Sequence, residues 1–398
     1  MHNILLENDT PLSDEHMNID DAEFKHIERK EQIFDAELKS ESTSYNKDVW
    51  MRFIRSKVSI VSAVLVFLII LLSIFGPYLN NLTVTEQRWD LGRLPPRVQG
   101  LSRLGIMDGT GVRDIQVANL PNWEHAIVEI ISEFYHVGRL GNTPMLQVRV
   151  NEYLHAAHVH RANIENGITP DPTYLFFWFG SDALGRCLFL RLWQGTRVSL
   201  LLGFAVFLVN ISIGLIIGAM LGYYGGKFDM IMQRIMECLV NIPFLPMAIV
   251  LIMFLGSGLR SLIILFLIQG WIPVANNVRI QFYRFKNREY VLASRTMGAT
   301  DKRVMFKHIL PNAIGTTITF MALMIPHAIL TEAFLAYLGL GIEAPNPSIG
   351  VLLRNGQENL LSYPFMLFYP AIVIVTLMLA FNLMGNGLRD AFNPSLRK

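Results

Sequence analysis

The chain has 398 residues, of which 52% are hydrophobic and 17% are charged, and it contains two cysteines. This composition is too apolar for an ordinary soluble domain, and two cysteines do not make a disulfide framework. The formal net charge of +2 averages two unlike parts, because the first 46 residues hold twelve Asp/Glu against four Lys/Arg. We therefore expect an integral membrane protein with an acidic N-terminal tail.

The acidic tail, residues 1–50, is charged and low in aromatic residues, so we expect a disordered or loosely helical cytoplasmic extension. The first apolar run, Val58–Leu79, follows this tail and a basic flank. A cleavable signal peptide would begin with a short basic segment rather than a long acidic one. Residues 51–79 are therefore predicted to hold a retained first membrane span.

Residues 80–176 separate the first span from the later apolar runs and contain Trp89, Trp123 and the amphipathic-looking stretch Ala126–Tyr135. This mixture predicts a small folded insertion. Its sequence HAAHVH places three histidines close together: His155, His158 and His160. Two histidines at i, i+3 of a helix can share a metal ion. Without a cysteine or a second cluster we favour surface histidines and predict no metal site.

Residues 177–398 hold five further apolar runs of about 18 to 25 residues, the length that crosses a bilayer. They are Val198–Gly222, Cys238–Gly256, Ser261–Val278, Ile314–Leu338 and Pro364–Met384. The third span of the chain contains Asn241 and two prolines, and the fourth contains Gln269 and a proline. Such residues are tolerated where neighbouring helices satisfy the freed backbone groups. We expect these two spans to line the interior of an all-α bundle of six spans.

The distribution of basic residues orients the spans. Flanks and short loops on one side hold seventeen Lys/Arg, whereas the short loops on the other side hold only Arg260 and Arg354. Cytoplasmic loops carry the excess of Lys and Arg, so both termini are predicted to be cytoplasmic. The long segment 80–197 is then extracytoplasmic, and the two halves of the chain show no internal repeat.

Eight of the basic residues lie in one cytoplasmic loop, residues 279–312. Its pattern predicts a short helix over Tyr290–Met297, a break at Gly298, a second short helix and a return to the membrane at Leu310-Pro311. Glycine allows a sharp change of direction, and proline suits the first helical position of the next span. A helix-glycine-helix wedge at the membrane surface is typical of a docking element.

One face of the first short helix is suited to contact. Tyr290, Ala293 and Met297 fall on the same side at i, i+3, i+7 spacing. Three small residues would let the backbone of a partner approach closely: Ala293, Ser294 and Ala299.

The stretch Glu289–Asn312 resembles the EAA loop of ABC-importer permeases, which inserts into a groove of the ATP-hydrolysing subunit. The family pattern is E-A-A-x3-G-x9-I-x-L-P. The residues at these seven positions are Leu292, Ala293, Ser294, Gly298, His308, Leu310 and Pro311. Leu292 in place of glutamate removes a charge, for which Glu289 partly compensates from one turn earlier. The resemblance implies that this loop couples the chain to an ATPase.

Four further stretches resemble the second, C-type membrane subunit of the oligopeptide/dipeptide ABC-importer family. They are WFGSDALGRCLFLRLWQGTRVSLLLG from Trp178, GYYGGKFD from Gly222, AILTEAFLAYLGLG from Ala328 and AFNLMGNGLRDAFNP from Ala380. The resemblance implies a six-helix permease of the type I ABC importer fold, in a bacterial cytoplasmic membrane. It also implies a homologous second permease, two ATPase subunits and an extracytoplasmic substrate-binding protein.

The chain lacks the phosphate-binding pattern G-x4-G-K-[ST], so ATP is expected to be used by partner subunits. We therefore expect a transport subunit that is not an enzyme and that binds no cofactor. Contact with membrane lipid is expected, and nucleic acid is not an expected partner.

Glu332 lies inside the fifth span, with His327 about one turn earlier. An ionisable group in a span is a functional candidate by default, so Glu332 is predicted to line the translocation path or hold a gate. A structural hydrogen bond to a neighbouring helix is the equal alternative. Asn241 is the second candidate for the path.

A further group of arginines borders the second span: Arg186, Arg191 and Arg197. We expect them to anchor the chain at the lipid headgroups, and a gating role is the less favoured alternative.

Other functions remain open at this stage. Relatives of the resembled family carry nickel or other small solutes, and the binding protein rather than the permease chooses the substrate. A proton-coupled secondary carrier would use Glu332 and His327 for coupling. A membrane sensor would signal through the basic loop without any flux.

Overall fold

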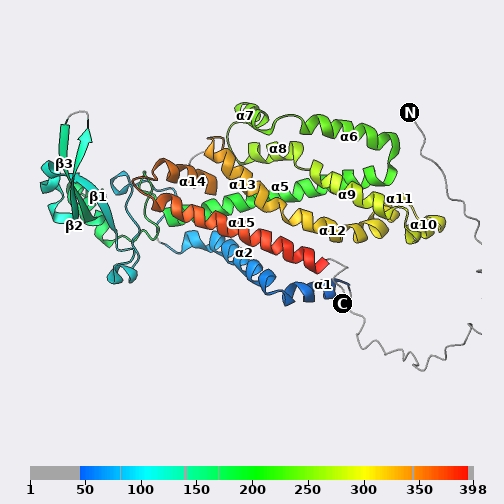
Figure 1. The fold of residues 1–398 in the computed structure, drawn as a ribbon, viewed down its shortest axis with the longest axis horizontal. Helices are drawn as coiled ribbons and strands as arrows, with labels where there is room; N and C mark the ends of the chain where they lie inside the picture. Colours follow the sequence, from blue (N-terminus) through cyan, green and yellow to red (C-terminus); the bar gives the residue numbers. More distant parts are fainter. Residues whose placement is uncertain (1–44, 81, 139–140, 169, 343–344, 393–398) are drawn as a thin grey trace, which may run out of the picture. The chain divides into compact units, whose positions relative to one another are not determined.

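The computed structural model describes residues 45–80, 82–138, 141–168, 170–342 and 345–392. The contacts divide the chain into residues 1–48 and residues 49–398, and the fold described below is that of the second unit (Figure 1). Most of the predicted acidic tail lies outside the described residues. The first helix, α1, runs over Tyr45–Arg55 and begins before the expected boundary at residue 50.

The helices after α1 are α2 (Lys57–Phe75), α3 (Glu152–Val159), α4 (Arg161–Glu165), α5 (Leu188–Tyr224), α6 (Gly226–Val240), α7 (Phe244–Leu255), α8 (Leu259–Gln269), α9 (Ile272–Phe285), α10 (Glu289–Thr296), α11 (Asp301–Arg303), α12 (Leu310–Ala322), α13 (Met324–Tyr337), α14 (Ile349–Glu358) and α15 (Phe365–Phe392). Short 3-10 helices are η3 (Gly76–Tyr78), η4 (Trp89–Leu91), η5 (Leu101–Leu104), η6 (Val117–Asn122), η7 (Glu124–Ala126) and η8 (Pro172–Tyr174), and η9 (Val304–Ile309) is a π-helix.

Within the described residues, five segments are long and apolar enough to cross a membrane: Lys57–Tyr78, Leu188–Tyr224, Leu259–Phe285, Phe320–Tyr337 and Phe365–Phe392. The pair α6 and α7 passes the same test together but bends by 78°. Six spans are therefore reached when this bent pair is counted as one.

The predicted third span, Cys238–Gly256, is not a continuous helix. Pro243 lies at the break, where a proline removes a helical hydrogen bond and clashes with the preceding turn. The side-chain amide of Gln269 on α8 donates to the carbonyl oxygens of Leu239 at 2.7 Å and Ile242 at 2.9 Å. A neighbouring helix thus satisfies the backbone groups that the break exposes, as expected for a polar span.

Helix α5 is the centre of the bundle and packs against α2, α8, α9 and α13. Its 37 residues begin ten residues before the predicted second span. Three glycines at four-residue spacing, Gly214, Gly218 and Gly222, face α9. A Cβ at Gly218 would lie 2.4 Å from the carbonyl oxygen of Ala275. These small residues therefore allow α5 and α9 to touch backbone to backbone.

The insertion is folded, and it contains a sheet rather than helices alone. Strands β1 (Thr110–Gln116), β2 (Ile127–Gly138) and β3 (Gly141–Asn151) form an antiparallel sheet in the order β1-β3-β2. The amphipathic-looking stretch Ala126–Tyr135 is mostly strand β2. Apolar side chains of β1 and β3 form a small core beside Trp123. The all-α prediction thus holds for the membrane helices but does not extend to the insertion.

Candidate functional site

The loop between α9 and α12 has the predicted helix-glycine-helix form. Helix α10 ends at Thr296, Gly298 adopts a left-handed φ of +80°, and α11 begins at Asp301. A residue with a Cβ resists this conformation, so glycine fits the turn. The π-helix η9 then runs directly into α12, which carries Pro311 in its first turn.

The inner face of the loop is part of the membrane core. One apolar cluster joins loop residues to α5, α9 and α12, and its buried members from the loop are Val291, Val304, Met305 and Ile309. Ala299 and Leu310 are partly buried against the same cluster. The loop is therefore packed on the helices behind it and is not a free tether.

The outer face of α10 is available for contact. Tyr290 is 40% exposed and Met297 is 80% exposed, and Ala293 and Glu289 are exposed as well. Ser294 differs from expectation: it is buried, and its hydroxyl donates to the carbonyl oxygen of Tyr290 at 2.8 Å. The surface offered outward thus includes Tyr290, Ala293 and Met297, and Ser294 stabilises the helix from within.

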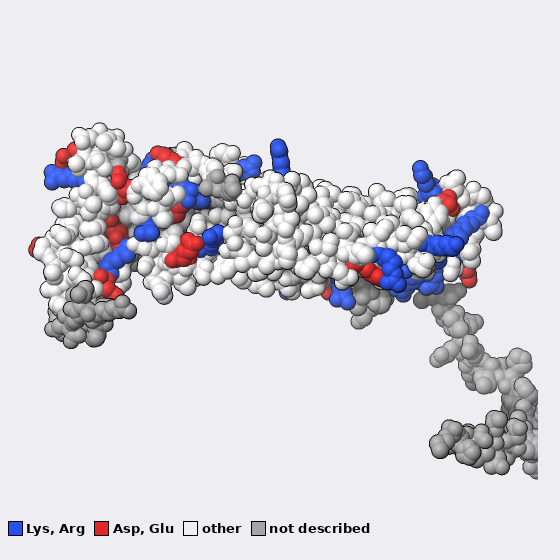
Figure 2. Space-filling view, turned by 90° about the horizontal axis from the view of Figure 1, so that it is seen from above, with Lys and Arg blue, Asp and Glu red and all other residues white. Residues whose placement is uncertain are grey.

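Basic side chains surround this loop. On the face drawn in Figure 2, blue and red side chains gather over the insertion and over the end that holds α10 and α11, and the stretch between them is largely uncharged. An uncharged belt between two charged ends is the arrangement that a bilayer requires.

A bidentate ion pair ties α6 to α9 close to the loop. Arg279 donates from Nε and Nη2 to the two carboxylate oxygens of Asp229 at 2.5 and 2.6 Å, and the hydroxyl of Tyr283 donates to Asp229 at 2.8 Å. Asp229 ends the GYYGGKFD motif, but its partners were not identified from the sequence. They lie some fifty positions later in the chain, and only the fold brings them together.

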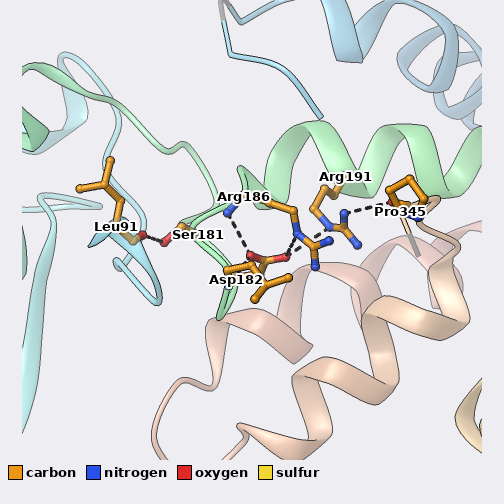
Figure 3. A network of polar contacts seen from close by, with 7 residues as sticks. Leu91, Ser181, Asp182, Arg186, Arg191 and Pro345 are labelled. Atoms are coloured by element: carbon orange, nitrogen blue, oxygen red, sulfur yellow. Dashed lines mark hydrogen bonds and ion pairs between the residues drawn. The ribbon is translucent and has the colours of Figure 1, made fainter. Parts of the chain in front are cut away.

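The segment before α5 and the first turn of α5 form a buried polar network, shown in Figure 3 (Ser181, Asp182, Arg186 and Arg191). We call it the external elbow, because the distribution of Lys and Arg predicts that this end of α5 is extracytoplasmic. Asp182 accepts hydrogen bonds from the backbone of Leu184 and of Arg186, each at 2.9 Å. Its second oxygen lies 2.7 Å from Nε of Arg186 and 3.4 Å from Nε of Arg191. The hydroxyl of Ser181 donates to the carbonyl of Leu91 at 2.6 Å.

The prediction that all three arginines lie at the lipid headgroups is wrong for two of them. The side chains of Arg186 and Arg191 are 7% and 2% exposed, because both guanidinium groups pair with the buried carboxylate of Asp182. A buried charge needs such a partner. Arg197 alone is exposed. Asp182, the residue that organises the elbow, was overlooked although it lies four positions before Arg186 in the recognised motif.

Glu332 is fully buried and accepts a hydrogen bond from the hydroxyl of Ser199 on α5 at 2.9 Å. The same hydroxyl accepts from the backbone N–H of Ile349 on α14 at 3.3 Å. This contact matches the structural alternative that the sequence left open. His327 is exposed, so it does not share the environment of Glu332. Asn241 is also exposed, at the break between α6 and α7, and does not line the interior of this chain's own bundle.

Comparison with known proteins identifies the family of this chain. The profile described as "Binding-protein-dependent transport system inner membrane component" matches residues 214–398. The profile described as "N-terminal TM domain of oligopeptide transport permease C" matches residues 44–96. The oligopeptide transport system permease protein OppC of Bacillus subtilis is 48% identical over 221 residues, which cover 56% of this chain and 72% of the relative. The chain belongs to the family of inner-membrane transport permeases that these matches describe.

A second relative is similar to this chain over the insertion as well. The dipeptide transport system permease protein DppC of Lactococcus lactis is 31% identical over 356 residues, covering 88% of this chain and 91% of the relative. Because the alignment covers so much of this chain, it must include residues of the insertion, 80–176. Among solved structures, the MetNI methionine ABC transporter matches 51% of this chain and 96% of the matched chain, with 19% identity and a TM-score of 0.44.

The histidines of the permease insertion form a stack of rings. The centroid of His155 lies 3.5 Å from that of Trp123, and the centroid of His125 lies 3.9 Å from that of His158. Burial is the main cause that lowers the pKa of His155, to about 4. Among the described residues, no group of three or more His, Cys, Asp or Glu side chains is placed to hold a metal ion.

Proposed function

We propose that the chain is one of two permease subunits of an ATP-driven importer for oligopeptides or dipeptides. Each of the two relatives described above is named as a permease of an oligopeptide or dipeptide transport system. The observation that carries the coupling role is the loop over residues 289–312. It has an exposed outer face at Tyr290, Ala293 and Met297, and its inner face is packed on α5, α9 and α12.

The loop is the proposed contact with the ATPase subunits. Glu289, Tyr290, Ala293 and Met297 would meet the ATPase, and Gly298, Ala299, Leu310 and Pro311 would set the angle and the base of the wedge. A displacement of the docked loop then moves the helices packed behind it. ATP is bound and hydrolysed by the partner subunits, and this chain holds no cofactor.

The path for the peptide lies between this chain and a homologous second permease. Glu332 is a proposed gate residue, because its hydrogen bond to Ser199 joins α13 to α5 and would break if these helices separated. Asn241 is exposed at the bend of α6 and α7, so it is free to face the second permease. A substrate-binding protein would deliver the peptide to the side of the insertion, and both termini lie in the cytoplasm.

The function is tested by affinity capture of the full chain from its host membranes, followed by reconstitution of the captured complex in proteoliposomes. Two ATPase subunits and a second permease should be recovered. Uptake of radiolabelled trialanine and of a mixed pentapeptide should require ATP, stop with vanadate and survive a protonophore. Excess nickel should not compete.

The alternatives give different results. Uptake that survives loss of the ATPase and collapses with the proton gradient would indicate a secondary carrier. Competition by nickel in place of peptide would indicate a metal importer of the same family. A chain captured without any ATPase partner, and without flux, would contradict the proposal altogether.

A further inference from the structure

Tyr223, in the last turn of α5, contacts both short helices of the loop. Its hydroxyl donates to a carboxylate oxygen of Asp301 at 2.5 Å, and the guanidinium carbon of Arg295 lies 4.8 Å from the centre of its ring. Arg295 belongs to α10 and Asp301 to α11, so these two residues lie on opposite sides of Gly298. One side chain of a membrane helix therefore bridges the hinge of the loop.

Packing and hydrogen bonding hold the side chain of Tyr223 in place. Tyr223 is 7% exposed and belongs to the apolar cluster that also holds Val291, Val304 and Met305. A hydrogen bond from a phenol to a carboxylate is charge-assisted and stronger than a neutral one. The neighbouring Tyr224 is 54% exposed, and its hydroxyl is 3.5 Å from the other oxygen of Asp301. Of the two tyrosines, only Tyr223 is both packed and closely bonded.

Helix α5 continues from Tyr223 to the opposite side of the membrane. Its 37 residues extend about 55 Å at 1.5 Å per residue, well beyond the roughly 30 Å of a bilayer core. The far end carries Arg191, which pairs with Asp182 and donates to the carbonyl of Pro345 at 3.5 Å. The same helix is thus fastened to the loop at one end and to the external elbow at the other.

We propose that Tyr223 is a positioning residue for transport, which with Asp301 and Arg295 fixes the angle of the loop across Gly298. It transfers a displacement of the loop into α5 and so toward the external elbow. This inference rests on the proposed function, since it assumes that an ATPase moves the loop. The connection from the loop through Tyr223 to α5 is separate from the docking surface of the loop.

The test is Tyr223→Phe in the complete transporter, reconstituted in proteoliposomes. The change removes one oxygen and leaves the ring in its cluster and beside Arg295. Peptide taken up per ATP hydrolysed, measured with radiolabelled trialanine and a mixed pentapeptide, should fall several-fold while ATP hydrolysis continues. Tyr224→Phe is the matched control, and it should leave this ratio unchanged.

Asp301→Asn removes the charge from the other partner and should lower the same ratio. The double variant Tyr223→Phe with Asp301→Asn should be no worse than the more affected single variant, because both changes remove one interaction. A variant that is only poorly folded lowers uptake and hydrolysis together and keeps the ratio. An unchanged ratio in Tyr223→Phe, or fully additive single effects, would overturn the inference.

Failure of the proposed function can be distinguished from failure of the role of Tyr223. A wild-type complex without ATP-driven peptide uptake would refute the proposed function. A wild-type complex that transports, beside a Tyr223→Phe complex with the same uptake per ATP, would refute only the role of Tyr223.

Discussion

At the scale of residues, Gly298 and Asp182 each set the local structure around them. Gly298 has a left-handed φ, and Asp182 holds two arginines inside the protein. The sequence pointed to Gly298 directly, because a helix break at a glycine is a local pattern. It did not point to Asp182, since the burial of Arg186 and Arg191 results from packing against segments distant in the chain.

Gly298→Ala should weaken coupling without disturbing the surroundings. A non-glycine residue in the left-handed region costs about 1–2 kcal/mol, and a Cβ at this position would meet no atom within 4 Å. The loop should relax its angle, and ATP-dependent peptide uptake should fall while the chain remains in the complex. Uptake in proteoliposomes is the measurement.

Gly105→Ala is the control for this change. Gly105 is also left-handed, with a φ of +72°, and has the same open surroundings, but it follows η5 in the insertion, away from the loop. Equal losses of uptake in the two variants would mean that backbone strain alone, and not the loop angle, is responsible.

Asp182→Ala should destabilise the permease strongly. It leaves two buried guanidinium groups without their carboxylate, and breaking a buried pair typically costs about 3–5 kcal/mol. We expect a large fall in the melting temperature of the purified complex in detergent. Glu165→Ala is the comparison, because its pair with Arg161 is exposed and worth at most about 1 kcal/mol. Similar melting temperatures for both variants would contradict the role of the elbow.

At the scale of elements, the sequence predicted the form of the loop, whereas for the insertion it predicted a small fold but not the sheet. The loop follows a local helix-glycine-helix pattern that needs no distant contact to be recognised. The residues of strand β2 do not alternate strictly between apolar and polar, and its pairing with β3 has register shifts between Ile127 and Glu129 and between Ile130 and Ser132. A strand is recognised in a sequence by strict alternation. Because this alternation is broken, the sheet can be identified only from the observed pairing of the strands.

The stacked rings of the insertion make the stability of its folded state depend on pH. The folded state lowers the pKa of His155 from 6.5 to about 4, by burial and by nearby positive charge from His125, His158, Arg113 and His160. The folded state therefore binds fewer protons than the unfolded state between these values. Its stability is complete above about pH 6.5 and is lost as the pH falls toward 4.

The fluorescence of Trp123 should report this change, because its ring lies 3.5 Å from that of His155. We expect quenching as the pH falls from 6.5 to 4, measured as the difference between the native chain and Trp123→Phe. His155→Gln should remove most of the change. His160→Gln should keep it, because His160 lies beside Asp90 rather than in the stack. A titration that is the same in all variants would contradict the assignment.

At the scale of the whole molecule, the sheet of the insertion and the loop over residues 289–312 belong to separate apolar clusters. Thr110 and Asn151 are paired across β1 and β3, so the two ends of the sheet lie side by side. The apolar cluster that joins the loop to α5, α9 and α12 contains no residue of the insertion. Span number and order could be predicted from hydropathy alone. The bend of α6 and α7 follows from Pro243, and Gln269 donates to the carbonyl oxygens of Leu239 and Ile242 beside it.

Replacement of residues 111–150 by a short glycine-serine turn should therefore leave recovery of the ATPase subunits unchanged. Joining the paired ends costs little loop-closure entropy, and the elbow and the loop keep their own contacts. Affinity capture and quantification of the ATPase subunits is the measurement. Loss of the ATPase subunits, from a complex that still contains both permeases, would show that the insertion reaches the coupling end.

The bend between α6 and α7 decides on which side of the membrane the chain ends. A chain that crosses an odd number of times finishes opposite to where it began, and five unbroken segments alone would separate the basic flank of the first span from the basic C-terminal end. The inferred cytoplasmic position of both ends, which the excess of Lys and Arg favours, requires one crossing from the bent pair. Pro243 thus breaks the one segment whose crossing fixes the parity of the entire topology.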